Sequence, residues 1–519
     1  MKHPLPLALA IAITGASIAP ALAQTADTTR PAMIASASPF AADSPLPLHY
    51  PQFDRIADAD FAPAFDAGMA EDRKEAEAVA NDPDKPTFDN TIVALERSGQ
   101  LLDRATMVFF NLVGTDTNPT RETLRADYAP KFSAHNDAIR LNPKLFARIK
   151  ALYDQRATLG LDAESARLIE RYYTSFVRSG ANLNDADKTR LKTINSELAK
   201  LGTQFSQNVL KEVNDSAVVV DNKAELDGFS DEQIAGAAAA AKERKLDGKY
   251  VITLLNTTGQ PPESQLTNRG IRERLHKASV ARNSRGNAFD NTAIVSQVLK
   301  LRAERAKMLG YPTYAAYVLD DETAKTPQTV NDMLGKLAPP AVANARKEAA
   351  DLQAAIDREH EAKGERSFTL EPWDWAFYSE KVRQQKFDFD ESQLKPYLEM
   401  KNVLENGVFF AANKFYGIGF KERTDLPKYR ADIWTYDVTD SDGTPLAIFI
   451  FDPYARASKR GGAWMNSYVN QSGLMGTKPV VANQLNIPKP GEGKPTLLTW
   501  SEVTTTFHEF GHALHGMFS

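Results

Sequence analysis

The sequence TWSEVTTTFHEFGHALHGMFS occupies residues 499–519, and it is the stretch on which the interpretation of the fold depends. Thr499 is followed three residues later by Glu502, a capping-box pattern that predicts the start of a helix. On that helix His508 and His512 stand four residues apart, about one turn, so both imidazoles project from one face. Two imidazoles placed in this way can bind a single metal ion.

Glu509 completes a His-Glu-x-x-His pattern and lies about 100° around the helix from His508, so it can hold a water molecule without occupying the metal. Zinc polarises a carbonyl group and acidifies water, and a neighbouring carboxylate takes up the proton. We therefore predict that His508 and His512 bind one Zn²⁺ ion and that Glu509 is the general base of a hydrolytic reaction. The alternative is a polar helix face with two unrelated histidines, a coincidence expected in roughly one such chain in a hundred.

Two further residues of this helix need an interpretation. Seven residues of helix span about 10.5 Å, too far for one metal ion to bind both His508 and His515. We therefore expect His515 either to pack or to support the metal ligands without binding the metal. The extended metzincin pattern also fails, because it requires His at 518, where this chain has Phe518. Gly511 costs about 1 kcal/mol relative to Ala in a helix. Either a larger side chain would clash there with substrate or a neighbouring strand, or the glycine is a tolerated defect.

The segments that precede this helix are β-prone. Four candidate strands lie at 433–438, 446–451, 463–469 and 480–485. The first two are joined by Asp-Ser-Asp-Gly at 440–443, which is a hairpin signal. Residues 487–494 hold two Pro and two Gly and are predicted to form a loop. A small β-sheet is therefore expected next to the motif helix.

The remainder of the chain is predicted to be mainly α. Apolar residues recur at helical spacing within 46–213 and 268–416, and between them two short strands, 218–220 and 250–255, flank an Ala-rich helix. A length of 519 residues exceeds one compact core. We divide the chain into an N-terminal helical lobe at 45–250 and a catalytic region at 251–519.

Composition excludes several classes of function. The formal net charge is −5, without a basic stripe, which argues against nucleic acid and anionic membranes as partners. The chain has no cysteine, so disulfides, thiolate zinc ligands, a cysteine nucleophile and a lipoprotein anchor are excluded. Any zinc site must use His with Asp or Glu.

The N-terminus has the pattern of a Sec-type signal peptide. Lys2 is followed by an apolar run at 5–18 and by Ala-Leu-Ala at 21–23, which predicts a signal peptide at 1–23. An uncleaved anchor is the alternative, but the run is shorter than the roughly 20 residues that span a bilayer. Residues 24–44 are rich in Ala, Ser, Thr, Asp and Pro and are predicted to be a flexible leader. We expect a soluble periplasmic protein with no membrane contact after cleavage.

The motif helix, together with three other segments, resembles the thimet oligopeptidase (M3) family. The matching segments are 507–518, FDNTIVALE at 88–96, KRGGAW at 459–464 and NIPKP at 486–490. They are most similar to the bacterial peptidyl-dipeptidase branch of that family, and the resemblance covers about 45–519.

This resemblance implies an elongated, helical, two-lobed, zincin-type peptidase with a small sheet beside the active-site helix and a deep channel that admits short unfolded peptides. It implies that His508 and His512 bind zinc, that Glu509 is the base, and that the segment from Gly461 to Trp464 is the sheet edge that pairs with substrate. The peptidyl-dipeptidase branch releases dipeptides from free C-termini. We expect a monomer.

One departure from the family bears on the metal site. The family takes its third zinc ligand from a Glu on a later helix, and this chain ends at Ser519, seven residues after His512. We therefore expect the third ligand, and the residues that grip substrate, beyond Ser519 in a longer protein, so that the C-terminal part of the fold is missing here. Two alternatives remain: an oligopeptidase that cuts internal bonds, and an inactive fragment if the chain really ends at Ser519.

Overall fold

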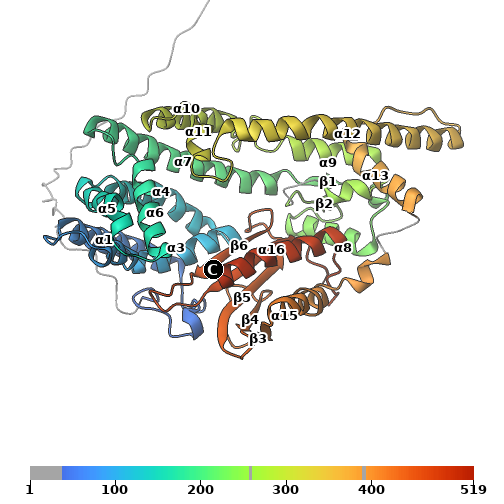
Figure 1. Cartoon of the computed structure of the whole chain (residues 1–519). Helices are drawn as coiled ribbons and strands as arrows, with labels where there is room; N and C mark the ends of the chain where they lie inside the picture. Colours follow the sequence, from blue (N-terminus) through green and yellow to red (C-terminus); the bar gives the residue numbers. More distant parts are fainter. Residues whose placement is uncertain (1–37, 256–259, 388–392, 492) are drawn as a thin grey trace, which may run out of the picture.

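The computed structural model describes residues 38–255, 260–387, 393–491 and 493–519. The predicted signal peptide at 1–23 and residues 24–37 of the predicted leader lie outside the described residues. Figure 1 shows an elongated, mainly helical molecule with a five-stranded sheet beside the last helix, as the resemblance implied. None of the described helices combines the length and apolarity needed to cross a membrane.

The N-terminal part is a stack of helices. They are α1 (Phe61–Asn81), α2 (Ala94–Glu96), α3 (Gln100–Thr115), α4 (Pro119–Arg140), α5 (Pro143–Gln155), α6 (Ala163–Arg178) and α7 (Asp185–Asp215). Four of them begin after a polar residue whose side chain accepts a hydrogen bond from a backbone N–H of the first turn, namely Asn118, Asn142, Asp162 and Asn184. Such caps fix the helix starts locally.

The middle of the chain forms a two-stranded sheet, with one helix between its strands, and then a series of helices. It contains β1 (Val218–Val220), α8 (Asp231–Glu243), β2 (Tyr250–Ile252), α9 (Arg269–Val280), α10 (Thr292–Met308), α11 (Tyr314–Leu319), α12 (Pro327–Lys363) and α13 (Pro372–Phe387). β1 and β2 are antiparallel, with Val220 opposite Tyr250. Figure 1 shows α12 along one side of the molecule, opposite the main sheet.

Five strands build the main sheet. They are β3 (Gly419–Glu422), β4 (Trp434–Thr439), β5 (Pro445–Tyr454), β6 (Trp464–Val469) and β7 (Val480–Ile487), preceded by α14 (Met400–Asn402) and α15 (Phe410–Tyr416). Their order is β3-β4-β5-β7-β6, antiparallel except for the parallel pair β5–β7. The four predicted strands and the hairpin are confirmed to within a few residues. The hairpin turn uses Gly443 at a φ of 84°, a conformation that favours glycine.

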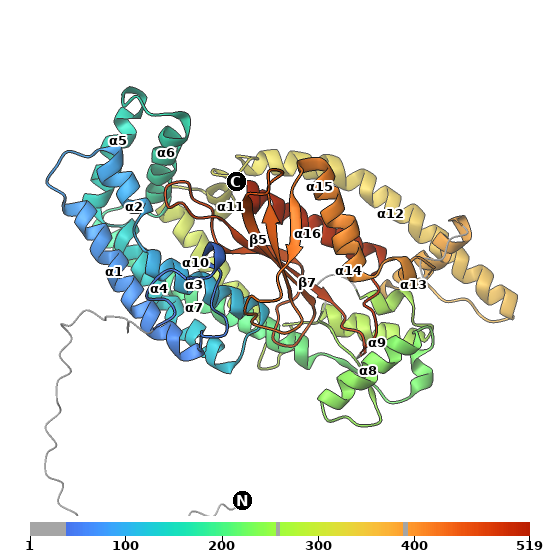
Figure 2. The ribbon, with the colours of Figure 1, turned by 90° about the horizontal axis from the view of Figure 1, so that it is seen from below.

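Both faces of this sheet are covered by helices. Along β5, Ile448 and Ile450 pack into the cluster formed with α1 and α3, whereas Phe449 and Phe451 pack into the cluster formed with α15 and the last helix. Figure 2 shows the sheet between these layers. A strand buried on both faces is apolar throughout rather than alternating, which explains the run Leu-Ala-Ile-Phe-Ile-Phe. The sheet therefore lies in the core of the molecule, with the last helix fixed against it.

Two predicted boundaries are wrong. The boundary at 250/251 falls inside β2, because the two-stranded sheet of β1 and β2 shares one apolar cluster with α8 and α9. The flexible leader does not extend to residue 44: Phe40 is only 3% exposed and packs against Phe61, with ring centroids 5.4 Å apart. The Arg104 guanidinium holds this segment by donating to the carbonyl of Phe40.

Candidate active site

The motif helix, α16 (Trp500–Phe518), is fixed at its start by the predicted capping box. The backbone N–H of Glu502 donates to Thr499 Oγ1 at 3.2 Å, and the backbone N–H of Thr499 donates to Glu502 Oε2 at 2.7 Å. Two N–H groups that would lack partners at a helix end are thereby satisfied. The cap therefore fixes the residue at which the helix begins.

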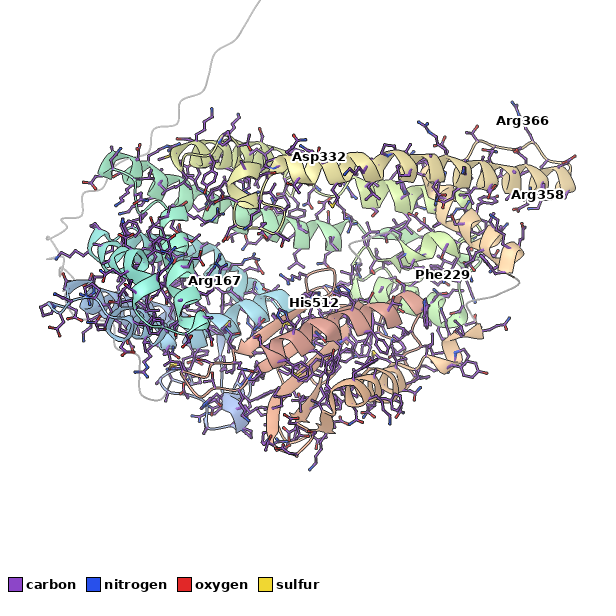
Figure 3. The ribbon with its side chains drawn as sticks, in the orientation of Figure 1. Arg167, Phe229, Asp332, Arg358, Arg366 and His512 are labelled. Carbon is purple, nitrogen blue, oxygen red and sulfur yellow. The ribbon has the colours of Figure 1, made fainter. Side chains whose placement is uncertain are left out.

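One face of α16 packs on the sheet. Its apolar residues recur at helical spacing and belong to the same cluster as Phe449 and Phe451 of β5. They are Val503, Phe510, Ala513 and Met517. Asn483 of β7 anchors the helix further, because its Nδ2 donates to the carbonyl oxygen of Glu509 at 2.7 Å. The opposite face is consequently left open. His512 is labelled in Figure 3 on α16, near the middle of the molecule.

The structure brings the two predicted ligands together on this open face. His508 and His512 are both exposed, and their Nε2 atoms are 3.1 Å apart. Two imidazole nitrogens bound to one tetrahedral zinc ion at 2.0–2.1 Å stand about 3.3 Å apart. The spacing of the two nitrogen atoms is therefore close to the spacing that one shared zinc ion requires.

Glu509 has a different environment from the two histidines. Its side chain is only 7% exposed, and its Oε2 atom is buried without a hydrogen-bond partner among the described residues. Burial raises the pKa of the Glu509 carboxyl, while the imidazoles of His508 and His512 act in the opposite direction. A carboxylate with a raised pKa and an unused acceptor atom beside two metal-ligand candidates is suited to take up a proton.

The described residues supply only these two ligands. Among them, no group of three or more His, Cys, Asp or Glu side chains is placed to hold a metal ion. The third ligand predicted beyond Ser519 concerns residues outside this chain and stays a prediction. His515 is exposed, and its side chain makes no hydrogen bond or ring contact within the described part of the chain, so packing of this side chain is not seen. A supporting role beside the metal ligands stays a prediction.

The two glycines of α16 have opposite environments. A Cβ on Gly511 would meet no other atom of the described chain within 4 Å, so the predicted clash with a neighbouring strand is wrong, and the open side remains available to substrate. A Cβ on Gly516 would lie 2.2 Å from Met465 Cε and 3.4 Å from Val481 Cγ1. Sequence analysis missed Gly516, because its constraint comes from strands that are distant in sequence.

This contrast gives a stability prediction. Gly511→Ala should raise the free energy of unfolding by up to about 1 kcal/mol, because it improves helix propensity without a clash. Gly516→Leu should lower it by about 1–3 kcal/mol, because the side chain is forced against β6 and β7. Urea unfolding followed by circular dichroism measures both. A loss of stability in Gly511→Ala would reveal a contact that the structure does not contain.

The predicted substrate-pairing segment leads into the edge strand of the sheet. Among the described strands, β6 has only β7 as a neighbour. The loop before β6 is held in place by Asn486, whose Nδ2 donates to the carbonyls of Arg460 at 2.9 Å and Gly462 at 2.6 Å. Lys459 is buried beneath this loop and donates to Asp452 Oδ1 at 3.0 Å. The sequence did not predict that Asn486 and Lys459 support this loop, because nothing in the neighbouring sequence marks the groups to which they donate hydrogen bonds.

Comparisons with known proteins identify the family of this chain. The model of peptidase family M3 matches residues 264–519. The dipeptidyl carboxypeptidase of Escherichia coli strain K12 is 45% identical over 482 residues, which cover 93% of this chain and 70% of that protein. Oligopeptidase A of the same strain is 31% identical and covers 91% of this chain and 69% of its own length. Saccharolysin of Saccharomyces cerevisiae is 26% identical over 72% of this chain and 52% of its own length. With such extensive similarity, this chain belongs to peptidase family M3.

Proposed function

We propose that this protein is a zinc-dependent peptidase that releases dipeptides from the free C-termini of short peptides. The observation that carries the proposal is the pair of Nε2 atoms of His508 and His512, 3.1 Å apart on an open helix face beside the buried carboxylate of Glu509. The 45% identity to a protein named dipeptidyl carboxypeptidase supports the dipeptide product. Identity to the proteins named oligopeptidase A is lower, at 31%, which makes internal cleavage the second candidate.

Each residue has a distinct task in this proposal. His508 and His512 would hold the zinc ion. Bound zinc supplies Lewis-acid chemistry, which polarises the scissile carbonyl and acidifies water. The Glu509 carboxylate takes a proton from the attacking water and returns it to the leaving amine. Asn483 of β7 binds the backbone carbonyl of Glu509 and thereby holds this turn of α16, with its carboxylate, in place against the sheet.

Substrate would add to the sheet at its edge. A peptide in extended conformation can pair with the outer edge of β6, which offers backbone groups that no other strand in the described part of the chain uses. At Ser467 the carbonyl already accepts a hydrogen bond from Asn111 Nδ2 at 2.7 Å, so pairing there competes with a side chain of α3. The free part of the edge is therefore the beginning of β6, at Trp464 and Met465.

A product assay tests the proposal. We expect an N-acetylated pentapeptide with a free C-terminus to lose its C-terminal dipeptide, and we expect the C-terminal amide of the same peptide to be cut much more slowly. Mass spectrometry of the products, with and without a zinc chelator, measures this. Cleavage at internal bonds that is indifferent to amidation would support the second candidate, and cleavage unaffected by the chelator would overturn the zinc mechanism.

Export to the periplasm is also part of the proposal. It is supported by the basic, apolar and small-residue pattern at 1–23. Mass spectrometry of the mature protein tests it, and an N-terminus other than Gln24 would contradict the cleavage site.

We propose a monomer, and light scattering during size-exclusion chromatography would detect a dimer.

A further inference from the structure

The edge strand β6 is closed near its far end by a buried side chain of α3. Asn111 is only 4% exposed, and its Nδ2 atom donates to the carbonyl oxygen of Ser467 at 2.7 Å. Figure 1 shows β6 between α3 and α16. A peptide that pairs with β6 at Ser467 would have to displace this donor before it could use the carbonyl. Covering an edge with a helix is one way in which proteins prevent strands from adding to a sheet.

A bulge in β6 lies at the same point. Ser467 is opposite Val481, whereas Val469 is opposite the adjacent residue Val480, so β6 has one extra residue there, Tyr468. Its side chain is 3% exposed and packs into the cluster formed with α1 and α3. A bulge increases the local twist of a strand and interrupts its regular hydrogen bonding. Two separate features therefore end the regular edge at Ser467, whereas the start of β6 has neither of them.

The part of α3 that carries Asn111 is fixed to the loop before β6. The backbone N–H of Arg460 donates to the carbonyl of Gly114 at 3.0 Å, and the N–H of Thr117 donates to the carbonyl of Ser458 at 2.9 Å. Asn111 precedes Gly114 by three residues, which is about one helical turn. The Asn111 side chain consequently has a rigid support, and displacing it would disturb contacts on both sides of the strand.

We propose that Asn111 sets the limit to which a substrate peptide can pair with β6, and that substrate residues beyond this limit add nothing to recognition. The inference rests on the proposed function, because release of dipeptides fixes two residues after the scissile bond and leaves all additional length before it. A peptide that pairs antiparallel to β6 has this N-terminal side beside Ser467. Asn111 is thus the residue that makes recognition independent of the total length of the peptide.

The register of the sheet gives the position of the limit. Met465 pairs with Asn483, whose side chain binds the backbone carbonyl of Glu509, so we place the scissile bond close to Met465. Ser467 follows Met465 by two residues, and paired strands advance residue by residue. The last substrate residue that can pair therefore lies roughly two residues before the scissile bond.

A series of peptides of increasing length tests the limit through binding. N-acetyl-Phe-Ala-Ala is extended by one to four alanines at its N-terminal side, and isothermal titration calorimetry measures Kd in the zinc-loaded Glu509→Gln background, which leaves the peptides intact. Affinity should improve with the first one or two alanines and then stay constant. Adding Asn111→Ala should lower Kd for the longest peptides by about 2- to 10-fold, the contribution of one backbone hydrogen bond, and should leave the shortest peptide unchanged.

Methylation of the peptide nitrogens separates this role from a purely structural one. Each alanine of the longest peptide is replaced in turn by N-methylalanine, which cannot donate a backbone hydrogen bond. In the Asn111→Ala variant one of these replacements should abolish the gain in affinity, whereas with Asn111 present the same replacement should have no effect. Asn111→Ser, whose side chain is too short to reach the carbonyl, should behave like Asn111→Ala. Thr106→Ala is the control on α3, because Thr106 Oγ1 donates to Leu102 of its own helix.

Each outcome decides for or against the limit. Affinity that keeps rising through all four alanines while Asn111 is present would overturn the inference, and so would identical length profiles with and without Asn111. If the Asn111 variants do not fold, the methylation series in the Glu509→Gln background decides alone, since a cost at the most N-terminal alanines would contradict the limit. The proposed function is judged separately, by whether the wild type releases dipeptides from the same peptides in mass spectrometry.

Discussion

Replacing Glu509 by Gln is expected to lower kcat for peptide hydrolysis by about 10²- to 10⁴-fold while the zinc content of the protein stays unchanged. Gln keeps the size of the side chain and can occupy the same buried position, which is only 7% exposed. It cannot accept a proton from water, so the loss should fall on the chemical step. Steady-state kinetics on the acid pentapeptide and metal analysis of the purified protein measure the two quantities.

The neighbouring histidines provide matched comparisons for this experiment. His512→Ala should remove zinc as well as activity, because it takes away one of the two nitrogens that stand 3.1 Å apart. His515→Ala should change neither, because its side chain is exposed and holds nothing in the described chain. Equal activity of wild type and Glu509→Gln would remove Glu509 from the mechanism, whatever the zinc content.

The site itself could be predicted because its information is local. The residues that define it lie within 14 residues of one another, and helical geometry alone sets their relative positions. They are Thr499, Glu502, His508, Glu509 and His512. The hairpin of β4 and β5 was predictable for the same reason, since its turn residues lie between two β-prone runs. The structure adds that Glu509 is buried while His508 and His512 are exposed. This difference arises because α16 packs on the sheet.

The unpredicted features all depend on contacts between segments that are far apart in sequence. The helical spacing within 46–213 does not reveal that α1 and α3 cover one face of a sheet whose strands begin at Gly419. Phe40 was assigned to a leader because its neighbours are polar and small, yet it fills a gap beside Phe61. Tertiary packing overrides local composition in such cases, and a single sequence does not record it.

The charged residues beside β6 show the same limit most clearly. Charged residues such as Asp452, Arg456 and Lys459 are typical of a surface loop. In the structure, however, Asp452 is only 1% exposed and Lys459 only 2% exposed. The two cations and the hydroxyl of Tyr429 all donate to the Asp452 carboxylate, Arg456 Nη1 and Tyr429 Oη each at 2.8 Å. Arg456 also donates to the carbonyl of Thr115 at 2.7 Å, which ties the loop to α3. One buried carboxylate therefore organises the segment that leads into the edge strand.

Asp452→Ala is expected to lower the free energy of unfolding by about 3–5 kcal/mol, because it leaves Lys459 buried without its counter-charge. The double variant Asp452→Ala with Lys459→Met should recover part of the loss, since the uncompensated buried ammonium is then absent. Urea unfolding at neutral pH measures both. Asp43→Ala is the control: its carboxylate is 59% exposed and pairs with Arg104 at the surface, where the pair is worth about 0–1 kcal/mol.

The pH dependence of this loss identifies the charge as its cause. Burial alone would raise the pKa of Asp452, but the hydrogen bond from Arg456 and the charge of Lys459 outweigh it, so the pKa is lowered. Such a group stabilises the fold above its unfolded pKa, near 4, and this contribution disappears as the pH falls through the lowered value. The wild type and Asp452→Ala should therefore differ most near neutral pH and converge in acid. A loss below 1 kcal/mol at pH 7, or one that is independent of pH, would show that the carboxylate does not hold this loop.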